Sequence, residues 1–158
     1  MNKGIEILSS GPICKYFRNS ILDQDVNWFS NNRYDVYDIN TKNWNKRNCH
    51  QQLKSQLKFP DYYGQNLDAF KDCLGDMHNP KYEGVVIALR RYDEFLNNDK
   101  KLALAILDII ARESRVWLVS GHKLITLIQS NEPHLVLPEI GGVSPDWNAN
   151  EWMNKERE

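Results

Sequence analysis

The sequence predicts an α/β protein, a small sandwich in which a short, mostly parallel β-sheet packs against helices. Two short apolar runs, residues 84–89 and 116–119, have the pattern of strands that are covered on both faces. Residues 33–39 are rich in β-branched and aromatic side chains, which favour a third strand. Helical segments separate these strands, and strands joined through helices are expected to lie parallel with right-handed crossovers.

The first part of the chain carries fewer signals. Residues 4–8 alternate weakly between apolar and polar side chains and predict a short strand. Residues 13–32 have a mixed composition that supports no prediction. After the 33–39 strand, residues 46–57 have a helical composition. Their buried stripe is expected to consist of residues that recur every four positions: Cys49, Leu53 and Leu57.

A loop and a helix follow at residues 60–77. Asn66 is well suited to cap this helix, because its side-chain oxygen can accept a hydrogen bond from a free backbone amide. One side of the helix gathers apolar residues: Leu67, Phe70, Cys73, Leu74 and Met77. The opposite side carries Asp68, Asp72 and Asp76. Acids four residues apart repel by a few tenths of a kcal/mol, and only Lys71 is placed to soften this repulsion.

The row of acids follows a loop that contains Tyr62, Tyr63 and Gly64. Most charged stripes are solvated helix faces, and a tyrosine pair can serve simply to fix a loop. An aromatic pair beside uncompensated carboxylates, however, is more typical of a surface that binds another protein. We therefore predict a protein-binding surface at this loop and helix.

The second half of the chain alternates helices and strands. We expect a polar connection over residues 90–98 and a deeply packed helix over residues 99–113. After the 116–119 strand, we expect another helix over residues 122–128 and an extended segment over residues 133–140. The charged end, residues 154–158, is expected to fray.

Composition limits the possible functions. The 158 residues suit a single domain, and 20 basic against 21 acidic residues give a formal net charge of −1. This balance provides no general attraction to nucleic acid or to an anionic membrane. Three cysteines without paired spacing argue against a disulfide framework, and no apolar stretch has the length of a membrane span. These features, with no signal-peptide pattern, predict a cytoplasmic protein.

The sequence shows no catalytic motif. The histidines His78, His122 and His134 fall in predicted turns or tails and are interpreted as scattered surface residues, and no metal-binding or cofactor-binding spacing appears. Two alternatives to a simple binding role stay open. One is a carboxylate-dependent enzyme that uses Asp68 and Asp72, with or without a magnesium ion. The other is a regulatory module that binds a basic protein without inhibiting it.

Residues 62–74, Tyr-Tyr-Gly-Gln-Asn-Leu-Asp-Ala-Phe-Lys-Asp-Cys-Leu, resemble the signature of the barstar family of ribonuclease inhibitors. The resemblance extends more loosely over about residues 33–120, which leaves residues 1–32 and 121–158 as extensions. It implies a short parallel sheet beside helices. It also implies an immunity protein or antitoxin that occludes the basic active site of a ribonuclease or ribonuclease-type toxin, as a monomer in a one-to-one complex, without catalysis or cofactor.

The resemblance assigns the contact surface residue by residue to Tyr62, Gly64, Asn66, Asp68 and Asp72. Asp72 would be the main anchor in the phosphate-binding centre of the nuclease, with Asp68 as its helper. Tyr62 would pack on the rim, and Gly64 would let the backbone approach the partner. Such carboxylates can occupy phosphate positions among cationic side chains.

The chain also departs from the family pattern. Lys71 stands where the family has a tryptophan, and the Thr-Gly-Trp run at the helix end is replaced by Gly75, Asp76 and Met77. For the glutamate that the family uses near the end of its last helix, Glu113 is the nearest candidate, although Arg112 has the better-aligned position. These changes alter the expected interface, in which Lys71, Gly75 and Asp76 are also expected to contact the partner. They predict a partner nuclease different from the one that the founding member of the family inhibits.

Overall fold

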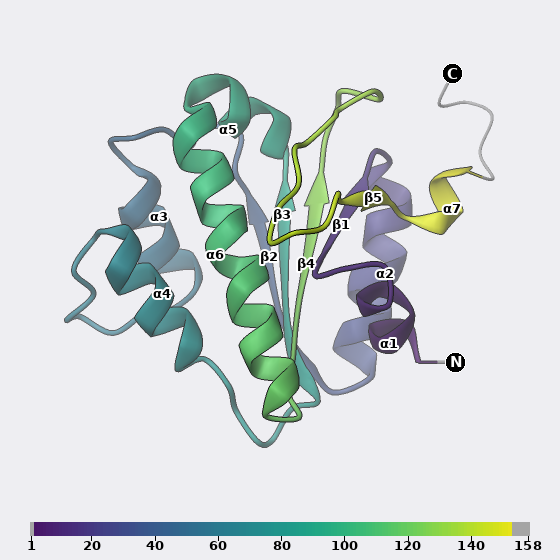
Figure 1. Ribbon diagram of the computed structural model, residues 1–158, viewed down its shortest axis with the longest axis horizontal. Coiled ribbons are helices and arrows are strands. Elements are labelled where there is room, and N and C mark those ends of the chain that lie inside the picture. Colours follow the sequence, from purple (N-terminus) through teal and green to yellow (C-terminus); the bar gives the residue numbers. More distant parts are fainter. Residues whose placement is uncertain (1, 153–158) are drawn as a thin grey trace.

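The computed structural model describes residues 2–152 and confirms the predicted α/β sandwich (Figure 1). Its centre is a five-stranded, parallel sheet with the strand order β2-β3-β4-β1-β5. The strands are β1 (Ile13–Tyr16), β2 (Tyr34–Asn40), β3 (Gly84–Arg90), β4 (Lys123–Gln129) and β5 (Asp146–Trp147). The N-terminal segment thus contributes β1, which pairs with β4 within the same sheet.

Helices cover both faces of the sheet (Figure 1). One face carries α1 (Lys3–Leu8) and α2 (Asn19–Asn31), and the other carries α3 (Cys49–Gln56), α4 (Leu67–Gly75), α5 (Tyr92–Asn98) and α6 (Lys100–Val119). A short helix, α7 (Ala149–Trp152), follows β5. Along β3, Val85, Ile87 and Leu89 join one apolar core, while Val86 and Ala88 join the other. The prediction of a strand buried on both faces is confirmed for β3.

The prediction of a strand over residues 4–8 is wrong, because this segment forms α1. The side chain of Asn2 caps the helix by accepting a hydrogen bond from the backbone N–H of Ile5 at 3.2 Å. Gly4 and Ile7, three residues apart, are buried on one side, whereas Ile5 is exposed. Helical spacing, rather than alternation, therefore places the apolar residues of this segment against the core.

The boundary between α6 and β4 also differs from the expectation. Residues 116–119 are the last turn of α6 and not a strand, because no glycine or proline interrupts the helix before Gly121. Only Trp117 of this turn is buried, and Val119 is 91% exposed. The segment 122–128, expected to be helical, instead forms most of β4, which lies between β3 and β1 and is buried on both sides.

The polar connection expected over residues 90–98 contains α5. Its residues Tyr92, Phe95 and Leu96 are buried at helical spacing, and Asp93 and Glu94 lie in the first turn, where the helix dipole favours acids. Residues 133–140 run without regular secondary structure up to a bridge between Ile140 and Val143. The prediction for residues 154–158 lies outside the described residues. No helix within residues 2–152 is both long and apolar enough to cross a membrane.

Candidate functional site

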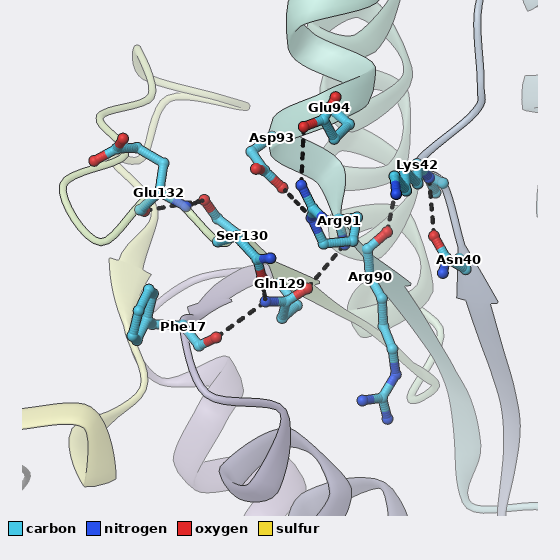
Figure 2. Close-up of polar contacts among 12 residues, drawn as sticks. Phe17, Asn40, Lys42, Arg90, Arg91, Asp93, Glu94, Gln129, Ser130 and Glu132 are labelled. Carbon is cyan, nitrogen blue, oxygen red and sulfur yellow. Dashed lines mark hydrogen bonds and ion pairs between the residues drawn. The ribbon is translucent and has the colours of Figure 1, made fainter. Parts of the chain in front are cut away.

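The carboxyl ends of the strands are closed by the chain's own polar groups (Figure 2). Parallel α/β folds commonly bind ligands at this edge. Here the fully buried side chain of Gln129, at the end of β4, accepts a hydrogen bond from the backbone N–H of Arg91 at 2.9 Å. Its amide nitrogen donates to the carbonyl oxygen of Phe17 at 3.0 Å and to the side-chain oxygen of Asn131 at 2.8 Å. A ligand at this edge would find these groups already bonded.

The helix cap predicted at Asn66 is confirmed, and it fixes where α4 begins. The Asn66 side-chain oxygen accepts a hydrogen bond from the backbone N–H of Ala69 at 2.8 Å, and its amide nitrogen donates to the carbonyl oxygen of Gly64 at 3.2 Å. The preceding Gln65 has a left-handed backbone, with φ of 53°. The cap therefore ties the loop to the helix and sets which residues of α4 face outward.

The two sides of α4 divide as the sequence predicts. Phe70, Cys73 and Leu74 are buried in the core between the sheet and the helices, and burial raises the pKa of the Cys73 thiol, as expected for a core residue. Asp68, Asp72 and Asp76 are exposed on the opposite side. None of these three carboxylates forms an ion pair with a side chain of residues 2–152. Their charge is therefore not neutralised by the described part of the chain.

The tyrosine pair before α4 divides into one buried and one exposed ring. Tyr63 is 5% exposed, packs on Phe59 with ring centroids 5.1 Å apart, and places its hydroxyl 2.6 Å from Nδ1 of His50. Burial raises the pKa of Tyr63 and lowers the pKa of His50. Tyr62, in contrast, is 76% exposed. Tyr63 thus holds the loop, and Tyr62 is left free for contact with another molecule.

Gly64 is exposed and does not serve the fold through its missing side chain. Its backbone is outside the left-handed region, and a Cβ added there would meet only ordinary van der Waals neighbours, the closest at 3.5 Å. Glycine costs backbone entropy on folding relative to alanine. The described structure therefore gives no internal reason for a glycine at this position.

A pocket of about 290 Å³ lies where the end of α4 packs against the end of α6. Of the predicted contact residues, it brings together Lys71, Asp72, Gly75 and Asp76, whereas Tyr62, Gly64, Asn66 and Asp68 lie outside its lining. The remaining lining residues come from the C-terminal half of α6 and from the connections that follow the two helices: His78, Glu113, Val116, Trp117, Ser120 and His122.

The pocket contains residues that sequence reasoning missed. The rings of His78 and His122 stack with centroids 3.4 Å apart and an angle of 18° between their planes, and Trp117 meets His78 edge-on. The interpretation of these two histidines as scattered surface residues is therefore wrong. They follow two helices that pack against each other, and no local sequence spacing signals that proximity. Across residues 2–152, no three or more His, Cys, Asp or Glu residues are arranged to hold a metal ion.

Comparisons with known proteins identify the family of this chain. The family model for barstar, the barnase inhibitor, matches residues 35–129, which is more than half of the chain. A protein of Bacillus subtilis (strain 168), named "Putative ribonuclease inhibitor YrdF", is 68% identical over 25 residues. That match covers 16% of this chain and 28% of the relative, so it spans little more than a quarter of the relative's length. Because the family model covers the sheet from β2 to β4 together with α3 to α6, the chain belongs to the barstar family.

Proposed function

We propose that this protein inhibits a ribonuclease by inserting the acidic face of α4 into the basic active site of the enzyme. The observation that carries the proposal is the set of three exposed carboxylates, Asp68, Asp72 and Asp76, which lack an ion-pair partner within residues 2–152. Such a row costs the isolated helix a little stability through repulsion. The cost is relieved when a cationic surface binds.

The chemistry of a ribonuclease cleft fits this surface. The cleft holds arginine, lysine and histidine side chains around the positions of RNA phosphates, and carboxylates on a capped helix can occupy those positions. Charge-assisted hydrogen bonds between carboxylates and guanidinium groups are short and strong. Complementary charge also speeds the encounter of the two proteins.

Four of the predicted contact residues receive a specific role in this proposal. Asp72 is the anchor, because it is exposed and lies beside the pocket, and Asp68 supports it one turn earlier on α4. Tyr62 supplies an exposed aromatic ring at the rim, since Tyr63 already fixes the loop. Gly64 allows the partner to approach the backbone, which accounts for a glycine that the fold does not require.

The biological setting follows from the same proposal. A ribonuclease inhibitor that resides with its target acts as an immunity protein or antitoxin, here as one inhibitor molecule on one nuclease. The cysteines Cys14, Cys49 and Cys73 are all free, which is compatible with the reducing cytoplasm. The protein needs no catalysis and no cofactor for this role.

The alternative of a carboxylate-dependent enzyme has less support. Asp68 and Asp72 lie on an outward helix face, and Asp68 does not line the pocket that Asp72 borders. Paired carboxylates in acid–base catalysis instead converge on a bound substrate within reach of its reacting atoms.

The proposal is tested by affinity capture on the immobilised full-length protein, followed by a ribonuclease assay on the retained material. We expect the column to retain a ribonuclease whose activity disappears when the free inhibitor is added in equimolar amount. A matched column carries the Glu6→Gln variant, in which an exposed residue of α1 is changed on the face of the sheet opposite α4. This column should retain the same enzyme. Retention of a basic protein without ribonuclease activity would instead support a non-inhibitory binding module and contradict the proposal.

A further inference from the structure

A second pocket, of about 300 Å³, lies where the end of α6 meets the loop between α1 and β1, and its walls are largely aliphatic. The aliphatic side chains come from four places in the chain: Leu8 ends α1, Pro12 precedes β1, Leu118 belongs to the last turn of α6, and Val143 precedes β5. None of the described residues that line this aliphatic pocket is aromatic or acidic. It therefore differs in chemistry from the pocket between α4 and α6, which acids and histidine rings line.

Four polar side chains line the aliphatic pocket, and two of them are already bonded within the fold. The hydroxyl groups of Ser9 and Ser114 donate hydrogen bonds to backbone carbonyl oxygens at 2.6 and 2.7 Å. The backbone N–H groups of Ser10 and Gly11 are also used, since they donate to carbonyl oxygens at the end of α1 at 3.1 and 3.0 Å. The guanidinium group of Arg115 and the hydroxyl group of Ser10, in contrast, have no hydrogen-bond or ion-pair partner within residues 2–152. These two groups are therefore the ones that can bind a ligand.

The guanidinium group of Arg115 lies against a turn of two glycines, Gly141 and Gly142, which both have a left-handed backbone. A Cβ added at Gly142 would lie 3.3 Å from Nη2 of Arg115, so the missing side chain leaves room for the guanidinium group. Asp108, two turns earlier on α6, does not neutralise Arg115. It pairs with Arg112 at 2.9 Å and accepts a hydrogen bond from the backbone N–H of Gly141 at 3.3 Å. The positive charge of Arg115 is therefore available to an anion from outside the described chain, beside apolar walls that strengthen the attraction relative to water.

The lining of the aliphatic pocket selects among anions. A guanidinium group is planar and matches the two oxygens of a carboxylate, and the Ser10 hydroxyl can donate a further hydrogen bond. A phosphate group carries more charge than the single cation of the described lining can balance. Nucleotides and aromatic acids would find no ring to stack on among the described lining residues. A flexible aliphatic chain fits the walls, and it would cover Leu118, which is 48% exposed.

We propose that the aliphatic pocket binds an aliphatic carboxylate of medium chain length, which is the chemistry of a free fatty acid. Its carboxylate pairs with the guanidinium group of Arg115, and its chain packs against Leu8, Leu118 and Val143. The volume of about 300 Å³ lies at the lower end of the range for small-molecule pockets, which fits a chain of this length. The site goes beyond the proposed ribonuclease inhibition and does not depend on it, because its described lining contains no residue of α4.

The aliphatic pocket connects the part of the chain that the family model matches to the segments before and after it. Arg115 and Leu118 lie within residues 35–129, whereas Leu8, Pro12 and Val143 lie outside this range. A ligand in the pocket contacts all three segments of the folded protein, and the unfolded chain offers no such site. Binding therefore stabilises the folded state by mass action. We expect octanoate to raise the midpoint of thermal unfolding of the wild type saturably and to leave that of Arg115→Gln nearly unchanged.

The direct test is an NMR titration of the methyl-labelled full-length protein with sodium octanoate at neutral pH, below the concentration at which octanoate forms micelles. We expect saturable shifts of the methyl signals of Leu8, Leu118 and Val143. The Arg115→Gln variant should lose about tenfold or more in affinity, because it loses hydrogen bonds to a charged group. Arg112→Gln is the matched control. It removes an exposed guanidinium group one turn earlier on α6 that is already paired with Asp108, and it should bind octanoate like the wild type. Leu118→Ser should weaken binding without changing the charge of the pocket.

Further probes separate the contributions of charge and chain. Octan-1-ol has the same chain without the charge and should bind several-fold more weakly. Acetate has the charge without the chain and should not saturate the site over the same concentration range. An unchanged affinity of Arg115→Gln, equal binding of octan-1-ol and octanoate, or shifts confined to other parts of the protein would overturn the site. Tighter binding of N-acetyl-leucyl-leucine than of octanoate would assign the pocket to a peptide C-terminus and overturn the fatty acid as its ligand. None of these measurements uses a ribonuclease, so the site and the proposed function stand or fall separately.

Discussion

Replacing Asp72 with alanine is expected to weaken binding to the partner nuclease by more than about 2 kcal/mol, or roughly 30-fold, as for an interface hot spot. Asp72 is exposed on α4 and has no ion-pair partner within residues 2–152. Its removal therefore breaks no contact that holds the described fold together. Because Asp68 and Asp76 flank it on the same helix face, removing the charge also relieves repulsion. The free energy of unfolding should stay the same or rise slightly.

Two measurements on one variant check this result. The dissociation constant with the captured ribonuclease is compared by titration calorimetry, and stability is compared by urea denaturation. Asp72→Asn keeps the shape and should lose most of the affinity, whereas Glu6→Gln should lose none. If Asp72→Ala unfolds the protein, the aspartate is structural, and the inhibitor proposal loses its anchor.

Replacing Asp25 with alanine is expected to lower the free energy of unfolding by about 3 kcal/mol, because it breaks a buried ionic and hydrogen-bonded group. Asp25 on α2 is 1% exposed. It accepts a hydrogen bond from the hydroxyl of Tyr16 at 2.5 Å and one from the side-chain amide of Asn148 at 3.2 Å, and it pairs with the ammonium group of Lys3 at 3.0 Å. The substitution leaves the hydroxyl of Tyr16, which is fully buried, without this acceptor.

Urea denaturation of the two full-length proteins measures this loss. Gln24→Ala, at the exposed neighbouring position on α2, is the matched control and should change stability only slightly. The helix α2 and the acidic face of α4 lie on opposite faces of the sheet. The Asp25→Ala variant should therefore keep its affinity for the partner under conditions in which the variant is folded. A loss no larger than that of Gln24→Ala would contradict a stabilising role for the Asp25 network.

The sequence correctly predicted those elements that are specified by a short, continuous stretch of residues. The apolar run of β3 and the cap of α4 at Asn66 are both of this kind. The end of α6 and the start of β4 could not be predicted in the same way, because a short apolar run is compatible with either a helix or a strand. The position of β1 between β4 and β5 depends on pairing between distant parts of the chain, which composition does not encode.

In the candidate site, too, features set by nearby residues could be predicted, whereas features set by the packing of distant segments could not. The exposed row of Asp68, Asp72 and Asp76 could be predicted, since helical periodicity alone places these acids on one side. The pocket could not, because Glu113 and the stacked His78 and His122 come together only through the packing of α4 on α6. The sequence placed Glu113 in a predicted helix but could not reveal its burial beside Gly75.

The most direct test of inhibition by occlusion is competition with RNA. A fluorescently labelled, non-cleavable RNA oligonucleotide is bound to the captured ribonuclease, and its displacement is followed by fluorescence anisotropy as the inhibitor is added. We expect the wild-type protein to displace the RNA completely at one equivalent, and Asp72→Ala to require a concentration roughly 30-fold or more higher. A ternary complex in which RNA stays bound beside the wild-type protein would show that the acidic face of α4 does not occupy the active site.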